Sequence, residues 1–188
     1  MNIAKVSRVA LPPKMLTILL CSGLLLLTQW VWAGDKSHAP VNFKNPIIPG
    51  FHPDPSIVRV GDDYYLANST FEWFPGMPIY HSRDLVNWQL IGHGLHRAGQ
   101  LTMQTGLEDY MGIFAPTLRY HDGLFYLITT CVRCEPKGGN FYITAKDPKG
   151  PWSDPVWLDS PGIDPSLMWD DDGKAYYVGH GNLSGKQE

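Results

Sequence analysis

An internal repeat constrains the fold of this chain more than any other feature. Three segments share one pattern: DPSIVRVGDDYYLA from Asp54, APTLRYHDGLFYLI from Ala115 and DPSLMWDDDGKAYYVG from Asp164. Each opens with X-Pro-Ser/Thr, and continues with a short apolar run, an acidic or Gly-bearing turn and an aromatic-rich run. This order is typical of a β-hairpin with a tight turn. Residues 170–173, which alone resemble a calcium-binding loop, fall at the third turn, so we predict a turn there.

A second type of hairpin follows the first two copies. IYHSRDLVNWQLIG begins at Ile79 and YITAKDPKGPWSDPVWL begins at Tyr142, and each reads as strand, Asp-containing turn, Trp and strand. Trp88 and Trp152 hold matching positions in the two segments and are predicted to be structural. Two hairpins give four strands per unit, and the units begin at residues 54, 115 and 164.

Four-stranded units at this spacing are typical of a β-propeller, in which each blade buries its faces against its neighbours. A β-sandwich is the alternative, but it gives no reason for internal self-similarity. The chain holds two full units and the opening hairpin of a third. We therefore predict an all-β fold, an incomplete propeller of about two and a half blades. Because propellers have about four to eight blades, we expect an N-terminal fragment.

The composition agrees with short strands joined by many turns. The 188 residues include 19 Gly and 16 Pro, and the aromatic content is 12%. The net charge is −3 and 18% of the residues are charged, as in an ordinary globular protein. A chain without a basic excess has no electrostatic footprint for phosphates, so we expect no nucleic-acid partner.

The first 33 residues have the order of a secretory signal peptide. Three basic residues precede an apolar run at residues 15–27, and Ala33 offers a small residue for cleavage. An uncleaved membrane anchor is the alternative, but residues 16–27 are too short to span a bilayer comfortably. Lipid attachment at Cys21 is a third reading, which is disfavoured because the apolar run continues past it.

Cleavage after Ala33 defines the predicted domains. Residues 1–33 are the signal peptide, residues 34–44 an N-terminal linker, and residues 45–188 a partial propeller domain. The mature protein is then secreted or periplasmic, with no stable membrane association. Two cysteines remain, Cys131 and Cys134, and no second pair exists to complete a zinc site. They are either a small-loop disulfide or two free thiols, and export favours the disulfide.

The X residue of X-Pro-Ser/Thr, the first residue of each copy, is the candidate catalytic position. It is Asp54 in the first unit, Ala115 in the second and Asp164 in the third. Asp before Pro is common turn chemistry, and Pro steers the preceding residue toward extended backbone. In a propeller, however, equivalent first-strand positions line the central channel at one end. We therefore expect both carboxylates to approach one another in an axial pocket.

Two carboxylates in an aromatic pocket suggest glycoside hydrolysis, in which one group activates water and another protonates the leaving oxygen. Aromatic faces suit sugar rings, and Phe71, Trp73, Phe74 and Phe114 lie near the X-Pro end of the repeats. Trp73 and Phe74 are equally well explained as packing residues of a blade. Asn68-Ser69-Thr70 matches a glycosylation sequon, which we treat as a chance match because a glycan would crowd this pocket.

Residues 45–181 resemble glycoside hydrolase family 43, the five-bladed propeller β-xylosidases and α-L-arabinofuranosidases. The resemblance is carried by GFHPDPS, STFEWFPG, SRDLVNW, GIFAPTLRYHDGLFYLIT, GNFYITAKDPKGPWSDPVW and GIDPSLMWDDDGK. It implies an inverting hydrolase of xylan- or arabinan-derived oligosaccharides, with Asp54 as general base and Asp164 as the carboxylate that tunes the acid and orients substrate. The implied substrate-binding residues are Phe71, Trp73, Phe114 and Ala115.

The sequence departs from the family pattern at the general acid. The family's acid is a Glu in an EGP-type motif in the next blade, and no such motif follows Asp164. Glu72 and Glu108 do not match it, so no residue receives the role and we expect this chain alone to be inactive. A calcium ion seen in some relatives belongs to a later blade, so we assign no cofactor. A non-catalytic carbohydrate-binding propeller fragment or pseudogene product is the alternative, and the choice between xylosidase and arabinofuranosidase stays open.

Overall fold

The computed structural model describes residues 42–104, 106, 109–135 and 138–181. The described part contains strands and turns and no helix, which confirms the all-β prediction. No helix among these residues is long and apolar enough to cross a membrane. The predicted signal peptide lies outside the described residues, as does most of the linker.

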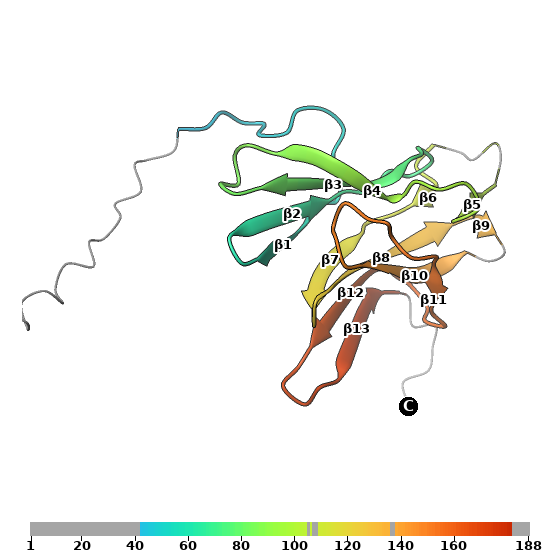
Figure 1. Ribbon diagram of the computed structural model, residues 1–188. Helices are drawn as coiled ribbons and strands as arrows, with labels where there is room; N and C mark the ends of the chain where they lie inside the picture. Colours follow the sequence, from blue (N-terminus) through green and yellow to red (C-terminus); the bar gives the residue numbers. More distant parts are fainter. Residues whose placement is uncertain (1–41, 105, 107–108, 136–137, 182–188) are drawn as a thin grey trace, which may run out of the picture. The chain divides into compact units, whose positions relative to one another are not determined.

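The first repeat unit forms a four-stranded antiparallel sheet (Figure 1). Its strands follow the chain order and are β1 (Ser56–Val60), β2 (Asp63–Ala67), β3 (Gly76–Ser82) and β4 (Gln89–Leu95). The β1–β2 register pairs Ser56 with Ala67 and Val60 with Asp63 across a two-residue turn. Gly61 in this turn has φ 62°, which a Gly adopts without strain.

The second unit repeats this arrangement. Its strands are β7 (Thr117–His121), β8 (Leu124–Val132), β10 (Gly139–Ala145) and β11 (Val156–Trp157). A short strand, β6 (Gly112–Ile113), pairs with the far end of β8. Trp152 is 1% exposed and belongs to the core, as predicted, and the Trp88 indole donates a hydrogen bond to the Leu85 carbonyl at 3.0 Å.

The third unit is a single hairpin within the described range. It consists of β12 (Ile163–Trp169) and β13 (Ala175–His180). The Asp170 amide donates to the Lys174 carbonyl, and the Asp172 carboxylate accepts from the Lys174 amide at 2.9 Å. Residues 170–173 therefore form the turn of this hairpin, which confirms the prediction.

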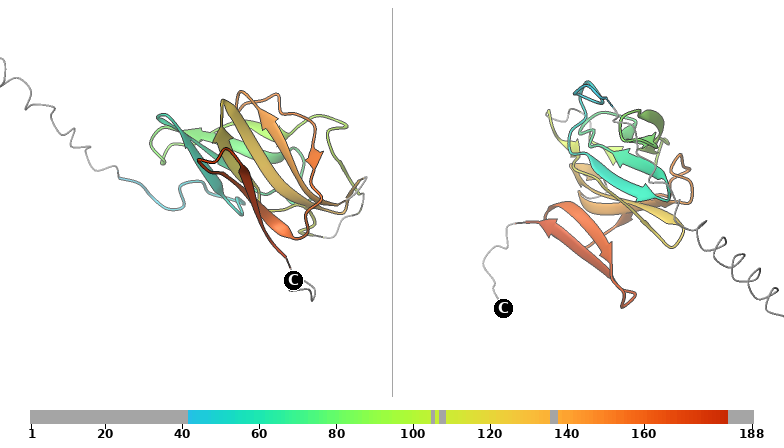
Figure 2. Two further views of the ribbon diagram at one scale, coloured as in Figure 1. Left: turned by 90° about the horizontal axis from the view of Figure 1, so that it is seen from below. Right: turned by 90° about the vertical axis from the view of Figure 1, so that its left-hand side faces the viewer.

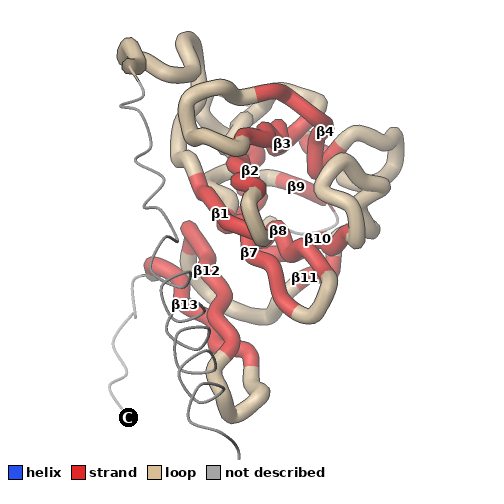
Figure 3. Tube along the Cα trace, turned by 60° about the vertical axis from the view of Figure 1, so that its left-hand side comes forward, coloured by secondary structure: helices blue, strands red, loops and turns tan. Residues whose placement is uncertain are grey.

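The units pack side by side through their first strands (Figures 2 and 3). Aromatic side chains add contacts between the units. Tyr65 of the first sheet contacts Phe125 of the second edge-on, with 5.1 Å between ring centroids. His121 of the second sheet stacks on Trp169 of the third unit at 4.6 Å. The main buried core lies within and between the first two sheets. Its members include Trp152, Phe141, Phe125, Met77, Ile79, Leu95, Ile113, Leu118, Leu127 and Ile143.

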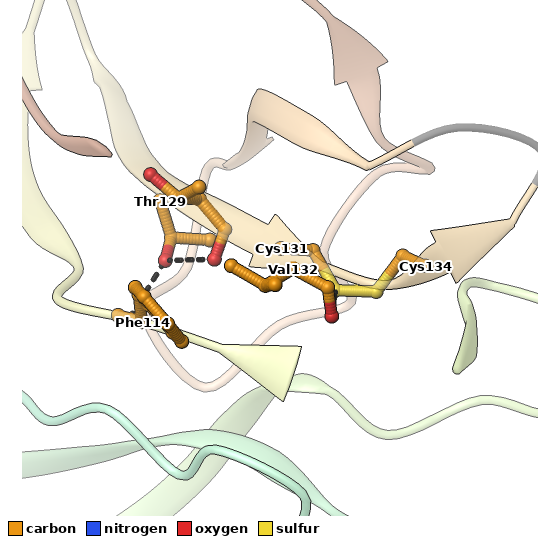
Figure 4. Close-up of a disulfide and its surroundings, with 6 residues drawn as sticks. Phe114, Thr129, Cys131, Val132 and Cys134 are labelled. Carbon is orange, nitrogen blue, oxygen red and sulfur yellow. Dashed lines mark hydrogen bonds between the residues drawn. A yellow bond between two sulfur atoms is a disulfide. The ribbon is translucent and has the colours of Figure 1, made fainter. Parts of the chain in front are cut away.

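A short disulfide closes the loop after β8. Cys131 and Cys134 are bonded, with their Cα atoms 5.7 Å apart, and this confirms the predicted pair. Cys134 begins β9 (Cys134–Glu135), which pairs with β5 (Thr102–Met103). The bond therefore ties a small two-stranded sheet to the end of β8, close to Thr129 and Phe114 (Figure 4).

The backbone of Phe71 meets the backbone of β6 at very close range. Phe71 and Ile113 exchange two hydrogen bonds, N to O, of 2.8 and 2.9 Å. Gly112 has φ 97°, and a Cβ at this position would lie 2.3 Å from the Phe71 carbonyl oxygen. Glycine is therefore required at position 112, both because its φ is positive and because a Cβ would clash with the Phe71 backbone.

We predict that Gly112→Ala destabilises the protein by about 2 to 4 kcal/mol, because it combines a positive φ with a clash against backbone. Urea unfolding measures the loss. Gly123→Ala is the matched control, since Gly123 has φ 79° but nothing within 4 Å of its added Cβ. It isolates the backbone strain, which costs about 1 kcal/mol. Equal losses in the two variants would contradict the close approach.

Candidate functional site

The first strands of the three units lie next to one another with their starts at one end. Ser56 Oγ on β1 accepts a hydrogen bond from the Leu118 amide of β7 at 3.0 Å. Arg119, the next residue, donates to Ser166 Oγ and to the Leu167 carbonyl of β12, at 3.0 Å each. The bonded residues hold nearly equivalent positions in the three copies. The X-Pro ends of the copies are therefore neighbours, in the order β1, β7, β12.

The three X residues stand at this end. Asp54 and Ala115 precede β1 and β7, and Asp164 is the second residue of β12, beside a register irregularity between Ile163 and Ser166. Both carboxylates are exposed, whereas Ala115 is half-buried. The structure thus places Asp54 and Asp164 at the starts of the two strands that flank β7, and both are exposed to solvent.

The backbone at both carboxylates differs from the sequence expectation. The Pro that follows Asp54 predicted an extended residue, but Asp54 has φ 51° and Asp164 has φ 54°. Both lie in the left-handed region, which Asp and Asn tolerate better than other non-glycine residues. Ala115 is not among the positive-φ residues. The two carboxylate copies share a strained backbone state, of a kind that costs about 1 to 3 kcal/mol and clusters at functional sites.

Hydrogen bonds from the loop after β2 hold Asp54 in this state. The Pro53 carbonyl accepts from the Asn68 side-chain amide at 2.9 Å and from the Ser69 backbone amide at 3.3 Å. The Ser69 hydroxyl donates to Asp54 Oδ2 at 2.6 Å. Asn68 and Ser69 are 1% and 2% exposed, so this support is rigid and screened from water.

Sequence reasoning missed Ser69 as a partner of Asp54. A signal was present in the hairpin register: Ser56 pairs with Ala67, so continuing the two strands by two residues places Asp54 opposite Ser69. Asn68 is buried and its amide is used by Pro53, which agrees with treating the glycosylation sequon as a chance match.

The residue before Pro53 is also held. His52 Nε2 donates to the Pro49 carbonyl at 3.2 Å, which leaves Nδ1 to accept from the Tyr80 hydroxyl at 3.4 Å. The His52 ring meets Tyr80 edge-on, with centroids 5.6 Å apart. Burial raises the pKa of Tyr80 above its ordinary value, so the phenol stays protonated and keeps donating at neutral pH.

Phe71 lies at the centre of an aromatic cluster next to this loop. Its ring centroid lies 6.1 Å from that of Phe51, 5.6 Å from that of Tyr110 and 5.8 Å from that of Phe114. Phe71 itself has φ 48°, which the two backbone bonds to Ile113 maintain. Of the sequence-predicted sugar-binding residues, the structure therefore brings Phe71 and Phe114 into contact.

Phe114 is fixed by strand β8 through its backbone (Figure 4). Its amide donates to the Thr130 carbonyl at 2.9 Å, and its carbonyl accepts from the Thr129 hydroxyl at 2.8 Å. Thr130 in turn donates to the buried Asn140 side chain at 2.6 Å. These bonds set the position of the segment that leads into Ala115.

Trp73 and Phe74 are not packing residues. They are 66% and 49% exposed, so the alternative that placed them in a blade core is wrong. Trp73 lies at a hollow of about 560 Å³, which we call the aromatic cavity. Its lining residues are Phe51, Phe71, Glu72, Trp73, Asp109 and Tyr110. Sequence analysis did not single out Phe51, Asp109 or Tyr110 for this surface, and Asp54, Phe114, Ala115 and Asp164 lie outside the lining.

Within residues 42–181, apart from the gaps given above, no group of three or more His, Cys, Asp or Glu side chains is placed to hold a metal ion. Glu108, which the sequence offered as an acidic residue near the pocket, lies outside the described residues. The X-Pro end carries two exposed carboxylates, and the Phe71 cluster lies next to the loop that holds Asp54.

The family model for glycosyl hydrolases family 43 matches residues 43–188. The chain belongs to this family. It is 52% identical over 159 residues to "Non-reducing end alpha-L-arabinofuranosidase BoGH43B" of Bacteroides ovatus, and 56% identical over 138 residues to "Xylosidase/arabinosidase" of Butyrivibrio fibrisolvens. These alignments cover 85% and 72% of this chain.

Solved structures of family 43 proteins share the fold. "Bacteroides ovatus Xyloglucan PUL GH43B" superposes with a TM-score of 0.70 and 54% identity, over 75% of this chain and 28% of that one. The chain spans 30% and 26% of the lengths of the two curated relatives. The family resemblance expected from the motifs is confirmed.

The support of Asp54 yields a stability prediction with a defined pH dependence. In Asn68→Asp the ionised side chain has no proton to donate to the Pro53 carbonyl, so we expect a loss of about 1 to 3 kcal/mol at pH 7. Burial raises the pKa of the introduced carboxyl above its unfolded value, so the loss is smaller at low pH, where the protonated group donates again. Urea unfolding of both proteins at pH 4.5 and pH 7 tests this. A pH-independent difference would contradict it.

Proposed function

We propose that the protein carrying this chain is an exported glycosidase of xylan- or arabinan-derived oligosaccharides, acting as a β-xylosidase, an α-L-arabinofuranosidase or both. The observation that carries the proposal is that Asp54 and Asp164 share the same backbone conformation and the same exposure. Both stand at the X-Pro end of the two units that flank the second unit, exposed and with positive φ. The similarity to an α-L-arabinofuranosidase and to a xylosidase/arabinosidase supports the substrate class.

Asp54 is proposed as the general base of an inverting mechanism. Its Oδ2 accepts from Ser69, and Oδ1 accepts no hydrogen bond from a described residue, so one oxygen is oriented and the other is available to water. Asp54 takes a proton from this water as the water oxygen bonds to the anomeric carbon. The glycosidic bond breaks at the same time, and a general acid protonates the leaving oxygen.

Asp164 is proposed to tune that general acid and to orient the sugar. A carboxylate near an acidic group disfavours the ionised form of that group and keeps it protonated at a higher pH. In the family the acid is a Glu beyond the motifs present in this sequence, so none of the 188 residues is given this role. Phe71, Trp73, Phe114 and Ala115 are proposed to contact the sugar.

The wider context of the site is also a proposal. We infer a five-bladed propeller that residues 45–188 build in part, a signal peptide at residues 1–33, and a secreted or periplasmic location. The partner is a small oligosaccharide, with no nucleic acid and no stable association with a membrane. The second candidate function is carbohydrate binding without hydrolysis, which the exposed aromatic cavity favours. Sugar binding with no turnover by the complete gene product would select it.

Substitutions at Asp54 separate its charge from its backbone role. Asn tolerates φ near 51° and its carbonyl still accepts from Ser69, so Asp54→Asn keeps the fold. We expect kcat of the complete gene product to fall by about 10²- to 10⁴-fold while the unfolding midpoint is unchanged. Hydrolysis of aryl xylosides and aryl arabinofuranosides measures this.

A companion variant tests the direction of attack. Asp54→Gly also accepts a positive φ and leaves space for azide, an anion that needs no general base. Azide is expected to restore turnover of an aryl glycoside and to give a glycosyl azide of inverted configuration, seen by proton NMR. Full turnover by Asp54→Asn, or an azide product of retained configuration, would contradict the assignment.

Asp164→Asn tests the tuning role through the pH profile. Removing a negative charge near the general acid lowers the pKa of that acid, so the alkaline limb of kcat/KM moves to lower pH. The acidic limb, which reports the base, stays in place. Asn again tolerates the backbone, whose φ is 54°. An unchanged alkaline limb would show that Asp164 acts only on binding.

A further inference from the structure

A buried asparagine joins the second sheet to the segment that leads into Asp164. Asn140 is the second residue of β10 and is fully buried. Its backbone carbonyl accepts from the Leu158 amide at 2.8 Å. Its side-chain Nδ2 donates to the carbonyl oxygens of Ser160 and Gly162, at 3.1 and 3.2 Å. Asn140 therefore holds every second residue of the connection between β11 and β12.

Further partners fix the orientation of this side-chain amide. The Thr130 hydroxyl of β8 donates to Asn140 Oδ1 at 2.6 Å, and Nδ2 also donates to the Tyr177 hydroxyl of β13 at 2.8 Å. A flipped amide would turn Oδ1 toward two carbonyl oxygens, which have no proton to donate. A buried polar network whose members are all bonded makes the surrounding structure rigid. The Asn140 side chain thus links β8, β10 and β13 to the segment before β12.

The position of Asp164 depends on the backbone of this segment. Its carboxylate accepts no hydrogen bond from a described residue. Its φ of 54° lies in the left-handed region, and such a state persists only where the surrounding structure over-determines it. Gly162, two residues earlier, lies so close to the His180 carbonyl that no Cβ would fit between them. The carbonyl that Asn140 holds therefore belongs to a segment packed tightly against the end of β13.

A buried asparagine also holds the backbone before the other carboxylate. The side-chain amide of Asn68 donates to the carbonyl of Pro53, the residue before Asp54. In both units, a buried Asn amide thus fixes a carbonyl one or two residues before an Asp with positive φ. The Asn at Asp54 comes from the same unit, whereas the Asn at Asp164 comes from the neighbouring sheet.

From this geometry we propose that Asn140 is a positioning residue of the glycosidase site, which sets the backbone state of Asp164 and with it the distance from its carboxylate to the general acid. The inference rests on the tuning role proposed for Asp164. A displaced carboxylate has a weaker effect on the acid, whose pKa then falls. Loss of the Asn140 amide therefore acts on the reaction as a partial loss of the Asp164 charge.

Asn140→Leu in the complete gene product tests this role, because Leu is similar in size and donates no hydrogen bond. The alkaline limb of kcat/KM is expected to move to lower pH, as with Asp164→Asn, and kcat/KM at the optimum to fall by about 10- to 100-fold. In an Asp164→Asn background, Asn140→Leu is expected to move the limb no further, because the charge that it positions is gone. Hydrolysis of aryl xylosides and aryl arabinofuranosides over a range of pH measures both effects.

Gln100→Leu is the matched control for the loss of a buried amide. Gln100 is 4% exposed, and its Nε2 donates to the carbonyls of Gly94 and Ser153 at 3.0 and 2.9 Å. Neither carbonyl belongs to the segment before Asp164. Both Leu variants are expected to lose stability in urea unfolding, since each leaves buried carbonyls unpaired. Only Asn140→Leu is expected to move the alkaline limb.

Thr130→Val is a milder second variant, which decides the question if Asn140→Leu does not fold. It removes the hydroxyl that bonds Asn140 Oδ1 and keeps the side-chain shape, so a smaller displacement of the limb in the same direction is expected. A limb that stays in place in these variants, while Asp164→Asn displaces it, would overturn the positioning role. An equal displacement by Gln100→Leu would also overturn it. A limb that Asp164→Asn itself leaves in place would instead contradict the proposed tuning role of Asp164.

Discussion

The reciprocal hydrogen bonds between Phe71 and Ile113 are the constraint on which the candidate site depends. They join the loop that follows the first two strands of one sheet to the strand that begins the next sheet. Gly112 permits the approach because no side chain could stand between the two backbones. With the loop fixed there, Ser69 and Asn68 reach back to the Asp54 segment, while Phe71 reaches outward to the aromatic cluster. One inter-sheet contact thus positions a carboxylate and a stacking surface together.

Much of the fold could be predicted because the same residue types recur at matching positions of each repeat copy. X-Pro-Ser/Thr, the turn residues and the aromatic second strand recur at each copy. The structure has a four-stranded sheet for the first unit, a five-stranded sheet that contains the four repeat strands of the second unit, and a hairpin for the third. The left-handed backbone at Asp54 could not be predicted from local rules. Proline opposes it, and it arises from the Pro53 carbonyl meeting Asn68 and Ser69, which are fifteen and sixteen residues away.

The candidate site was predicted in its residue types and less well in its surroundings. Asp54, Asp164, Phe71 and Phe114 were singled out from the repeat and the motifs, and their roles stay predictions. The neighbouring order of the first strands, β1, β7 and β12, agrees with the sequence analysis. Ser69 and Tyr110 were missed, because a hydroxyl that orients a carboxylate and an aromatic from a distant loop have no sequence pattern of their own. For Trp73 the sequence analysis could not choose between a sugar-binding residue and a packing residue of a blade, because an aromatic side chain beside a turn can have either role. Its exposure of 66% in the structure excludes the packing role.

Two requirements together explain why Asp occupies the X position of the first and third units: a backbone with positive φ and a negative charge. A positive φ alone is met by Gly or Asn at least as well, and the Ser69 hydroxyl can donate to an amide carbonyl as readily as to a carboxylate. Backbone geometry therefore accounts for the exclusion of most residues but not for a negative charge. A charge at a strained position that another loop holds in place has a chemical use as its simplest explanation, since Asn would satisfy the backbone and the hydrogen bond equally well. The second unit fits this account, because its X residue has no positive φ and is the uncharged Ala115.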